Sequence, residues 1–203
     1  MKHLRISLLL LSTLVICTTT LRAELIGLPV ADTAEYRDAG QLEFMPGAAV
    51  SKDVSYYGLR QTYSFLEGIR AFLDLGAADF DEKGTDFAGS LGATFCLPPA
   101  SFADLALRTS FYYANTDSVD IMGGTLALVT SDETLVNDLF IYSAFGCDLS
   151  QSEETLAAIT TTTLELNPLV SLGLLYNFTP SWGIFVEGTY ITSSFIGFGI
   201  KIR

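Results

Sequence analysis

Histidine is almost missing from this sequence, since its single copy is His3, close to the N-terminus. A Ser-His-Asp triad therefore cannot form in the rest of the chain, and zinc sites that depend on histidine are excluded in the same way. Basic residues are also few, with 11 Lys and Arg against 23 Asp and Glu, for a formal net charge of −12. A nucleic-acid partner needs a basic surface. We therefore expect no enzyme, no cofactor and no nucleic-acid partner.

Long apolar runs are missing beyond residue 23, where no stretch reaches the ~20 apolar residues of a membrane-spanning helix. The chain is nevertheless apolar, with 49% hydrophobic residues and a mean hydropathy of +0.39. Its apolar residues alternate with small or polar ones, and the final strand sets Ile196, Phe198, Ile200 and Ile202 against Gly197, Gly199 and Lys201. Because successive side chains of a strand point to opposite faces, this pattern predicts strands with one bulky apolar face.

The N-terminus has the three-part layout of a secretory signal peptide. Lys2 and Arg5 give a positive start, residues 6–17 are mostly apolar, and a short polar stretch ends at Ala23. We expect residues 1–23 to be the signal and residues 24–39 to be an irregular periplasmic lead-in. An uncleaved membrane helix and a lipid attached at Cys17 are the alternatives for this region.

Residues 40–203 are expected to form ten antiparallel strands, with eight as the alternative. The expected spans are 40–51, 53–65, 68–77, 86–96, 103–114, 119–130, 137–148, 161–178, 182–191 and 193–202. Connections after even-numbered strands are mostly short and rich in turn formers, whereas several of the others are longer and acidic or polar. Outer-membrane barrels have this asymmetry, with tight periplasmic turns and longer outer loops. The fold class predicted is all-β, a transmembrane antiparallel up-and-down β-barrel.

Charged residues within the predicted strands all fall on the face opposite the bulky apolar set. In a membrane barrel this face lines the lumen, and buried charges need partners. We therefore expect a lumen ion network of Glu43, Arg60, Arg70, Asp74, Asp104, Arg108, Glu165, Glu187 and Lys201. Carboxylates of Asp74, Asp104, Glu165 and Glu187 are the expected partners of Arg70 and Arg108. Tyr57, Tyr113 and Tyr190 near one rim, and Phe65, Phe178 and Trp182 near the other, match the aromatic girdles of membrane barrels.

Three segments carry a resemblance to a known family: the signal, the hairpin at residues 63–72 and the C-terminal residues 197–203. In these segments the chain resembles the small bacterial outer-membrane β-barrels, the OmpA/OmpX and porin-like superfamily. The ending resembles the signal read by the barrel-assembly machinery, with Gly197, Ile200 and Ile202 in the matching positions. It departs from that signal at Arg203, where a final aromatic is usual, and at Phe195, where a polar residue is typical. The resemblance implies an outer-membrane location of the Gram-negative type, contact with outer-membrane lipid, and assembly by that machinery.

At about ten strands a barrel is only slightly wider than its side chains can fill. We therefore expect a filled lumen and a structural or surface-interaction role. A narrow, porin-like passive channel is one alternative, and a secreted lipocalin-like barrel for an apolar ligand is another. Cys96 and Cys147 are expected to be free, mostly buried thiols. The acidic loop Asp79–Asp86 resembles the start of a calcium loop, and weak divalent cation binding is the corresponding hypothesis.

Overall fold

The computed structural model describes residues 27–30, 32–80, 84–98, 103–115, 119–156 and 159–203. The predicted signal, residues 1–23, lies outside the described residues. Ten strands follow in chain order: β1 (Leu42–Val50), β2 (Val54–Leu66), β3 (Ile69–Phe80), β4 (Gly84–Cys96), β5 (Asp104–Asn115), β6 (Val119–Glu133), β7 (Leu139–Leu156), β8 (Ile159–Asn177), β9 (Trp182–Tyr190) and β10 (Ser194–Ile202).

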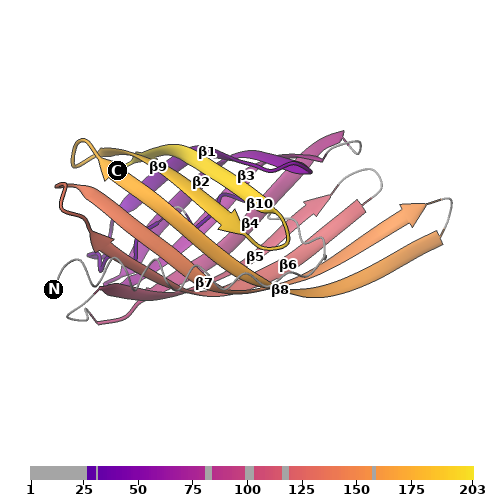
Figure 1. Ribbon diagram of the computed structural model, residues 1–203, viewed down its shortest axis with the longest axis horizontal. Coiled ribbons are helices and arrows are strands. Elements are labelled where there is room, and N and C mark those ends of the chain that lie inside the picture. Colours follow the sequence, from indigo (N-terminus) through magenta and orange to yellow (C-terminus); the bar gives the residue numbers. More distant parts are fainter. Residues whose placement is uncertain (1–26, 31, 81–83, 99–102, 116–118, 157–158) are drawn as a thin grey trace.

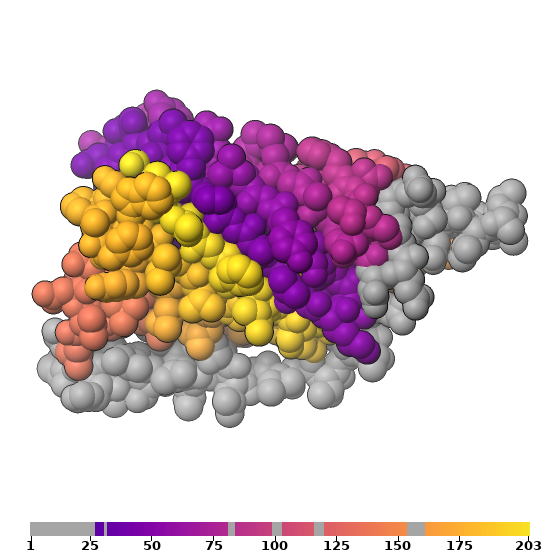
Figure 2. All heavy atoms as spheres, turned by 90° about the horizontal axis from the view of Figure 1, so that it is seen from above, coloured from indigo at the N-terminus to yellow at the C-terminus, as the bar shows by residue number. Residues whose placement is uncertain are grey.

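Each strand pairs with its sequence neighbours in antiparallel fashion, and the last pairs with the first. The closing contact places Phe44 opposite Ile202 and Ala48 opposite Phe198. Figure 2 shows the result, since the indigo first strands lie directly against the yellow last strand. The prediction of a ten-stranded up-and-down barrel is thus confirmed, and the alternative of eight strands is wrong.

The longest hairpin differs from the prediction. Residues 149–160 were expected to form a loop, but β7 and β8 stay paired from Leu149 opposite Leu166 out to Leu156 opposite Ile159. The Thr-rich run at 160–163 is β-prone because threonine is branched at Cβ. The hairpin therefore projects past its neighbours at the end of the barrel opposite the C-terminus (Figure 1).

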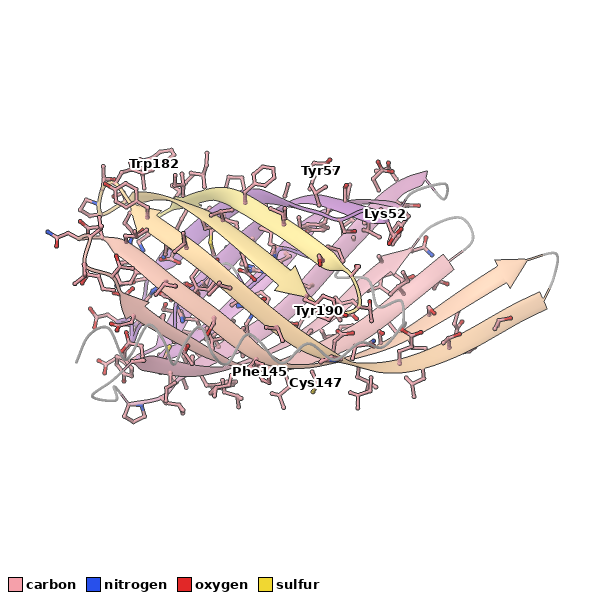
Figure 3. The ribbon with its side chains drawn as sticks, in the orientation of Figure 1. Lys52, Tyr57, Phe145, Cys147, Trp182 and Tyr190 are labelled. Atoms are coloured by element: carbon pink, nitrogen blue, oxygen red, sulfur yellow. The ribbon has the colours of Figure 1, made fainter. Side chains whose placement is uncertain are left out.

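The outer surface is apolar along the middle of every strand. Leu59, Leu75, Leu91, Phe111 and Leu126 are among the large side chains that point outward and are exposed. The predicted girdle residues Tyr57, Phe65, Phe178 and Trp182 are exposed as well, and Figure 3 shows Trp182 and Tyr57 toward opposite ends of the barrel. No helix among the described residues is long and apolar enough to cross a membrane.

The inner face carries small, polar and charged residues, as the alternation predicted, and buried aromatic and aliphatic side chains lie among them. Along β9, for example, Phe185, Glu187 and Thr189 are buried while Ile184 and Val186 are exposed. Strand β6, whose sequence pattern is less regular, still alternates between more and less buried positions over most of its length, whereas β7 alternates only over residues 144–150. The lumen is therefore the core of this molecule, and it contains both polar and apolar side chains.

Candidate functional site

The lumen contains a segment that precedes the first strand. The described residues 27–30 and 32–39 form no helix or strand, and Leu28, Val30 and Ala34 among them are buried. We call the described residues 27–30 and 32–37 the plug. The sequence did not predict that this part of the expected lead-in, residues 24–39, enters the barrel. That the segment lies on the periplasmic side of the membrane remains a prediction.

Glycines on the wall make room for the plug. A Cβ atom on Gly197 would overlap with Cγ of Pro29, and one on Gly47 would lie 3.2 Å from Cδ2 of Leu28. Gly197 therefore has no space for a larger side chain while Pro29 is in place. The plug packs directly on the backbone of β1 and β10.

Arg60 on β2 is the central anchor of the plug. Its Nε and Nη2 donate to the two carboxylate oxygens of Asp74, each at 2.7 Å. Its Nη1 also donates to the carbonyls of Pro29 at 2.7 Å and Val30 at 2.9 Å, and Nη2 to that of Leu28 at 2.5 Å. Carbonyls of an irregular segment have no strand partner, and a buried one left unpaired is costly. One guanidinium therefore satisfies three consecutive carbonyls.

Backbone N–H groups of the plug are bound by other strands of the wall. Leu28 N donates to Asp74 Oδ2 at 3.3 Å, and Val30 N donates to Glu187 Oε1 at 3.1 Å. Ala34 N donates to Ser131 Oγ at 2.9 Å. These acceptors stand on β3, β9 and β6. The plug is consequently tied to widely separated parts of the barrel.

A second group of contacts lies at the mouth at which β1 begins. Asp32 accepts from Arg37 Nη2 at 2.8 Å and pairs with Arg70 Nη1 at 2.9 Å. Arg37 also donates to Glu43 Oε2 at 2.6 Å. Glu43 in turn pairs with Lys201 at 3.6 Å and with Arg203.

The charge of Asp32 is stabilised by this arrangement. Burial alone would raise the pKa of its carboxyl group, but the attraction of Arg37, Arg70 and Lys201 outweighs burial and holds that pKa well below its usual range. Asp32 is therefore an anion that bridges the plug to β3.

The structure brings most of the predicted network into the lumen. Glu43, Arg60, Arg70, Asp74, Arg108, Glu187 and Lys201 are buried there. The partners differ from those expected. Arg70 pairs with Asp32, which was not among the candidate acids. Arg108 lies over the ring of Phe72, at 3.8 Å from its centroid, and makes no ion pair with a described carboxylate.

Two members of the predicted set lie apart from the others. Asp104 is the first residue of β5, and Glu165 lies on the part of β8 that extends beyond its pairing with β9, which runs only from Val170 to Asn177. Both side chains are half-buried. The alternation along a strand identifies the face on which a residue lies. Its position along the barrel axis decides whether neighbouring strands enclose that face.

Sequence reasoning missed several lumen residues. Asp32 and Arg37 precede the strands, so the alternation of inward and outward positions along a strand cannot place them. Asp148 is buried and accepts hydrogen bonds from the Tyr112 hydroxyl at 2.9 and 3.1 Å. Tyr142 donates to Glu187 at 2.9 Å. Asp148 is a lone charge within an otherwise uncharged stretch of β7, which is the signal that could have marked it.

Both cysteines are free, as expected, but only one faces inward. Cys96 is half-buried and accepts from Arg70 at 3.4 Å. Cys147 is exposed on the outer surface (Figure 3), so the expectation that both thiols are mostly buried is wrong for it. It stands opposite Pro168 on the apolar exterior.

The acidic loop is shorter than predicted, because β3 continues to Phe80 and β4 begins at Gly84. Asp81, Glu82 and Lys83 lie outside the described residues. No cluster of three or more His, Cys, Asp or Glu able to hold a metal occurs in the part of the chain that the structure describes.

Comparisons with known proteins give likenesses in structure alone. No protein-family model matches the sequence, and the search of curated proteins found no significant match. The KdgM porin is similar at a TM-score of 0.46 and 10% identity, over 79% of this chain and 98% of that one. The N-terminal β-barrel domain of Pseudomonas aeruginosa OprF is similar at a TM-score of 0.38 and 14% identity, over 82% of this chain and 98% of that one. Neisserial surface protein A is similar at a TM-score of 0.36 and 11% identity, over 80% of this chain and 94% of that one.

The resemblance to small bacterial outer-membrane β-barrels that the sequence carries is confirmed at the level of fold. The apolar outer face and the charged inner face of the strands agree with this fold.

Proposed function

We propose that this chain is an integral outer-membrane β-barrel with a structural or surface-interaction role, whose lumen is closed by its own N-terminal segment. The exterior supports the membrane location. Val186, at the middle of β9, is 48% exposed, and comparable apolar side chains surround the barrel. Charged side chains that point outward, such as Asp79 and Asp86, stand near strand ends. A continuous apolar belt is stable against lipid and unfavourable in water.

The observation that carries the closed lumen is the set of bonds from Arg60 to the carbonyls of Leu28, Pro29 and Val30. These bonds hold the plug across the interior in place of water. A passage for solutes needs continuous water, and the plug interrupts it. The proposed role is thus one of the barrel surface and of the envelope rather than of transport.

Two measurements on the full chain test this proposal. Cell fractionation and heat-modifiable migration on a gel should place the protein in the outer membrane as a folded barrel, whereas a lipocalin-like protein would be soluble without detergent. Planar bilayers containing the parent protein should stay electrically silent. A stable open conductance of the parent would contradict the closed lumen.

A gated narrow channel is the second candidate, and the fit of the plug favours it. Gly197 provides space that Pro29 of the plug occupies, and every contact that holds the plug among the described residues is non-covalent. Displacement of the plug would leave a polar passage. In that case the parent would be silent at rest and would conduct after the plug contacts are weakened.

Three further contacts are proposed for the barrel. We infer that the exterior contacts outer-membrane lipid, that the barrel-assembly machinery reads Gly197, Ile200 and Ile202, and that the loop Asp79–Asp86 binds divalent cations weakly. Ile200 is exposed on the outer face, whereas Gly197 is buried against the plug. Ile200→Asn should therefore lower assembly in cells more than refolding in detergent, and equal losses would argue against an assembly signal.

Absence of catalysis is also proposed. It rests on the sequence, in which no histidine follows His3.

A further inference from the structure

A small cavity remains inside the barrel beside the plug. Its volume is about 30 Å³, which leaves room for about one or two waters or one ion of similar size. Leu28, Pro29 and Val30 of the plug form one side of it, so the cavity presupposes the docked plug of the proposed function. The barrel wall supplies the rest of the lining, which includes the apolar Phe72 and Leu169 as well as Arg108 and the hydroxyl groups of Ser110, Tyr112, Thr125 and Ser171.

Arg108 is the only buried cation among the described residues that lacks a carboxylate within ion-pair distance. It is 6% exposed. Its single protein hydrogen bond among the described residues runs from Nη1 to Thr94 Oγ1, at a long 3.5 Å. Its Nε and Nη2 donate to no described residue. A buried guanidinium in this state retains most of the cost of leaving water.

The neighbours of Arg108 increase that cost. Arg60 lies over the same ring of Phe72, at 4.8 Å from its centroid, so two guanidinium groups share one aromatic side chain. Asp74 neutralises Arg60 through two hydrogen bonds. The ring face attracts Arg108 but carries no net charge. Among the described residues, a negative charge in direct contact with the Arg108 guanidinium is therefore the element missing from this arrangement.

The wall beside Arg108 can supply a further donor. Ser110 and Thr125 share one hydrogen bond of 2.6 Å, which uses one of their two hydroxyl protons and leaves the other able to turn into the cavity. The corresponding pair of Ser171 and Thr189 differs, because Thr189 already donates to Glu187 at 2.7 Å and its bond with Ser171, also 2.7 Å, uses the remaining proton. Donors thus gather on the side where Arg108 lies.

We propose that this cavity is a binding site for one small monovalent inorganic anion of halide size, held by the Arg108 guanidinium and the Ser110–Thr125 hydroxyl pair. Chloride is the halide expected in saline media. The small volume excludes organic anions such as gluconate. Binding would neutralise Arg108 and stabilise the barrel with its plug in place.

The test uses full-length protein folded in detergent, at constant ionic strength and neutral pH. Replacing sodium gluconate by sodium chloride or bromide should raise the melting temperature of the parent saturably. Arg108→Met should lose this halide dependence. Lys52→Met, which removes an exposed cation, should keep it. Absence of a specific halide effect in the parent, or its persistence in Arg108→Met, would overturn the proposal.

A second readout covers the case in which Arg108→Met does not fold. The ³⁵Cl resonance should broaden in the presence of folded parent, and bromide should reverse the broadening by competition. Broadening that bromide does not reverse, or no broadening, rejects the site. If the melting temperature does not depend on halide and bilayers containing the parent stay silent, only the anion site is rejected. If the melting temperature does not depend on halide and the parent conducts, the docked plug of the proposed function is rejected as well.

Discussion

Arg60 and Asp74 face each other directly across β2 and β3, and two parallel hydrogen bonds of 2.7 Å join the guanidinium to the carboxylate. Both side chains are almost completely buried. The same two groups hold the plug, because Arg60 binds three of its carbonyls and Asp74 accepts from Leu28 N. A planar guanidinium can do both because its five N–H donors point in different directions in one plane. A wall pair is thus also the clamp of the plug.

Removing Arg60 should weaken the barrel and open its lumen. Arg60→Met leaves the Asp74 carboxylate buried without its cation, and breaking one side of a buried pair costs about 3–5 kcal/mol. The carbonyls of Leu28, Pro29 and Val30 lose their donor at the same time. We expect a lower melting temperature together with ion conductance in planar bilayers.

A double variant separates the two effects. Arg60→Met combined with Asp74→Leu removes both charges, and such replacements are often neutral for stability. It should melt closer to the parent than Arg60→Met does and still conduct, because the plug remains unclamped. A silent Arg60→Met barrel would show that the plug does not depend on this clamp.

The apolar exterior leads to a prediction that distinguishes lipid from water. Val186 lies at the middle of β9 with its side chain outward and 48% exposed. Arg at the middle of a lipid-facing strand costs about 2–4 kcal/mol, whereas a surface substitution of a soluble protein is usually within about 0.5 kcal/mol. Val186→Arg should therefore reduce folding into lipid vesicles strongly. Ser181→Arg, in the exposed turn before β9, is the matched control and should fold like the parent. Equal yields would contradict the membrane location.

Much of the barrel is readable from the sequence because a period of two is a local property. The alternation along each strand was enough to predict that Arg60, Asp74 and Glu187 lie inside the barrel. It failed for Glu165 as a member of an enclosed network, since β8 extends there beyond the end of β9. How far one strand outruns its neighbour depends on register, which no single strand encodes.

The plug was not readable for a different reason. Residues 27–39 have no periodicity, and the charges of Asp32, Glu35 and Arg37 are typical of a solvated segment. Asp32 and Arg37 are nevertheless buried, because Arg70 and Glu43 stand at the mouth as their partners. Those contacts join residues that are distant in sequence. Only the closed barrel brings them together.

Topology can be tested with single cysteines in a background lacking Cys96 and Cys147. Lys52 lies in the turn between β1 and β2, and Ser181 lies in the turn between β8 and β9. These turns are at opposite ends of an up-and-down barrel, and both positions are exposed. A membrane-impermeant thiol reagent should label Lys52→Cys in intact cells, and should label Ser181→Cys only after the outer membrane is opened. The reverse pattern would invert the proposed orientation.

Acid should release the plug within a defined range of pH. The pKa of Asp32 is lowered by folding: burial opposes this, but Arg37 and Arg70 outweigh burial. A carboxyl group with a lowered pKa in the folded state contributes stability above its unfolded pKa, and that contribution is lost as the pH falls toward the folded value. The contribution of Asp32 to the melting temperature, measured as the difference between the parent and Asp32→Asn, should therefore be similar at pH 7 and pH 5 and should shrink below about pH 4, the ordinary range of an Asp carboxyl group.

Asp32→Asn shows whether this residue is responsible. The amide keeps the shape of the side chain and removes its charge, so the variant should melt below the parent at neutral pH and lose part of the acid-dependent drop. Bilayer conductance should follow the same order, with the parent opening only in acid and Asp32→Asn opening at a higher pH. If Asp32→Asn reproduces the parent curve in both measurements, the ion pairs of Asp32 with Arg37 and Arg70 do not control the docking of the plug.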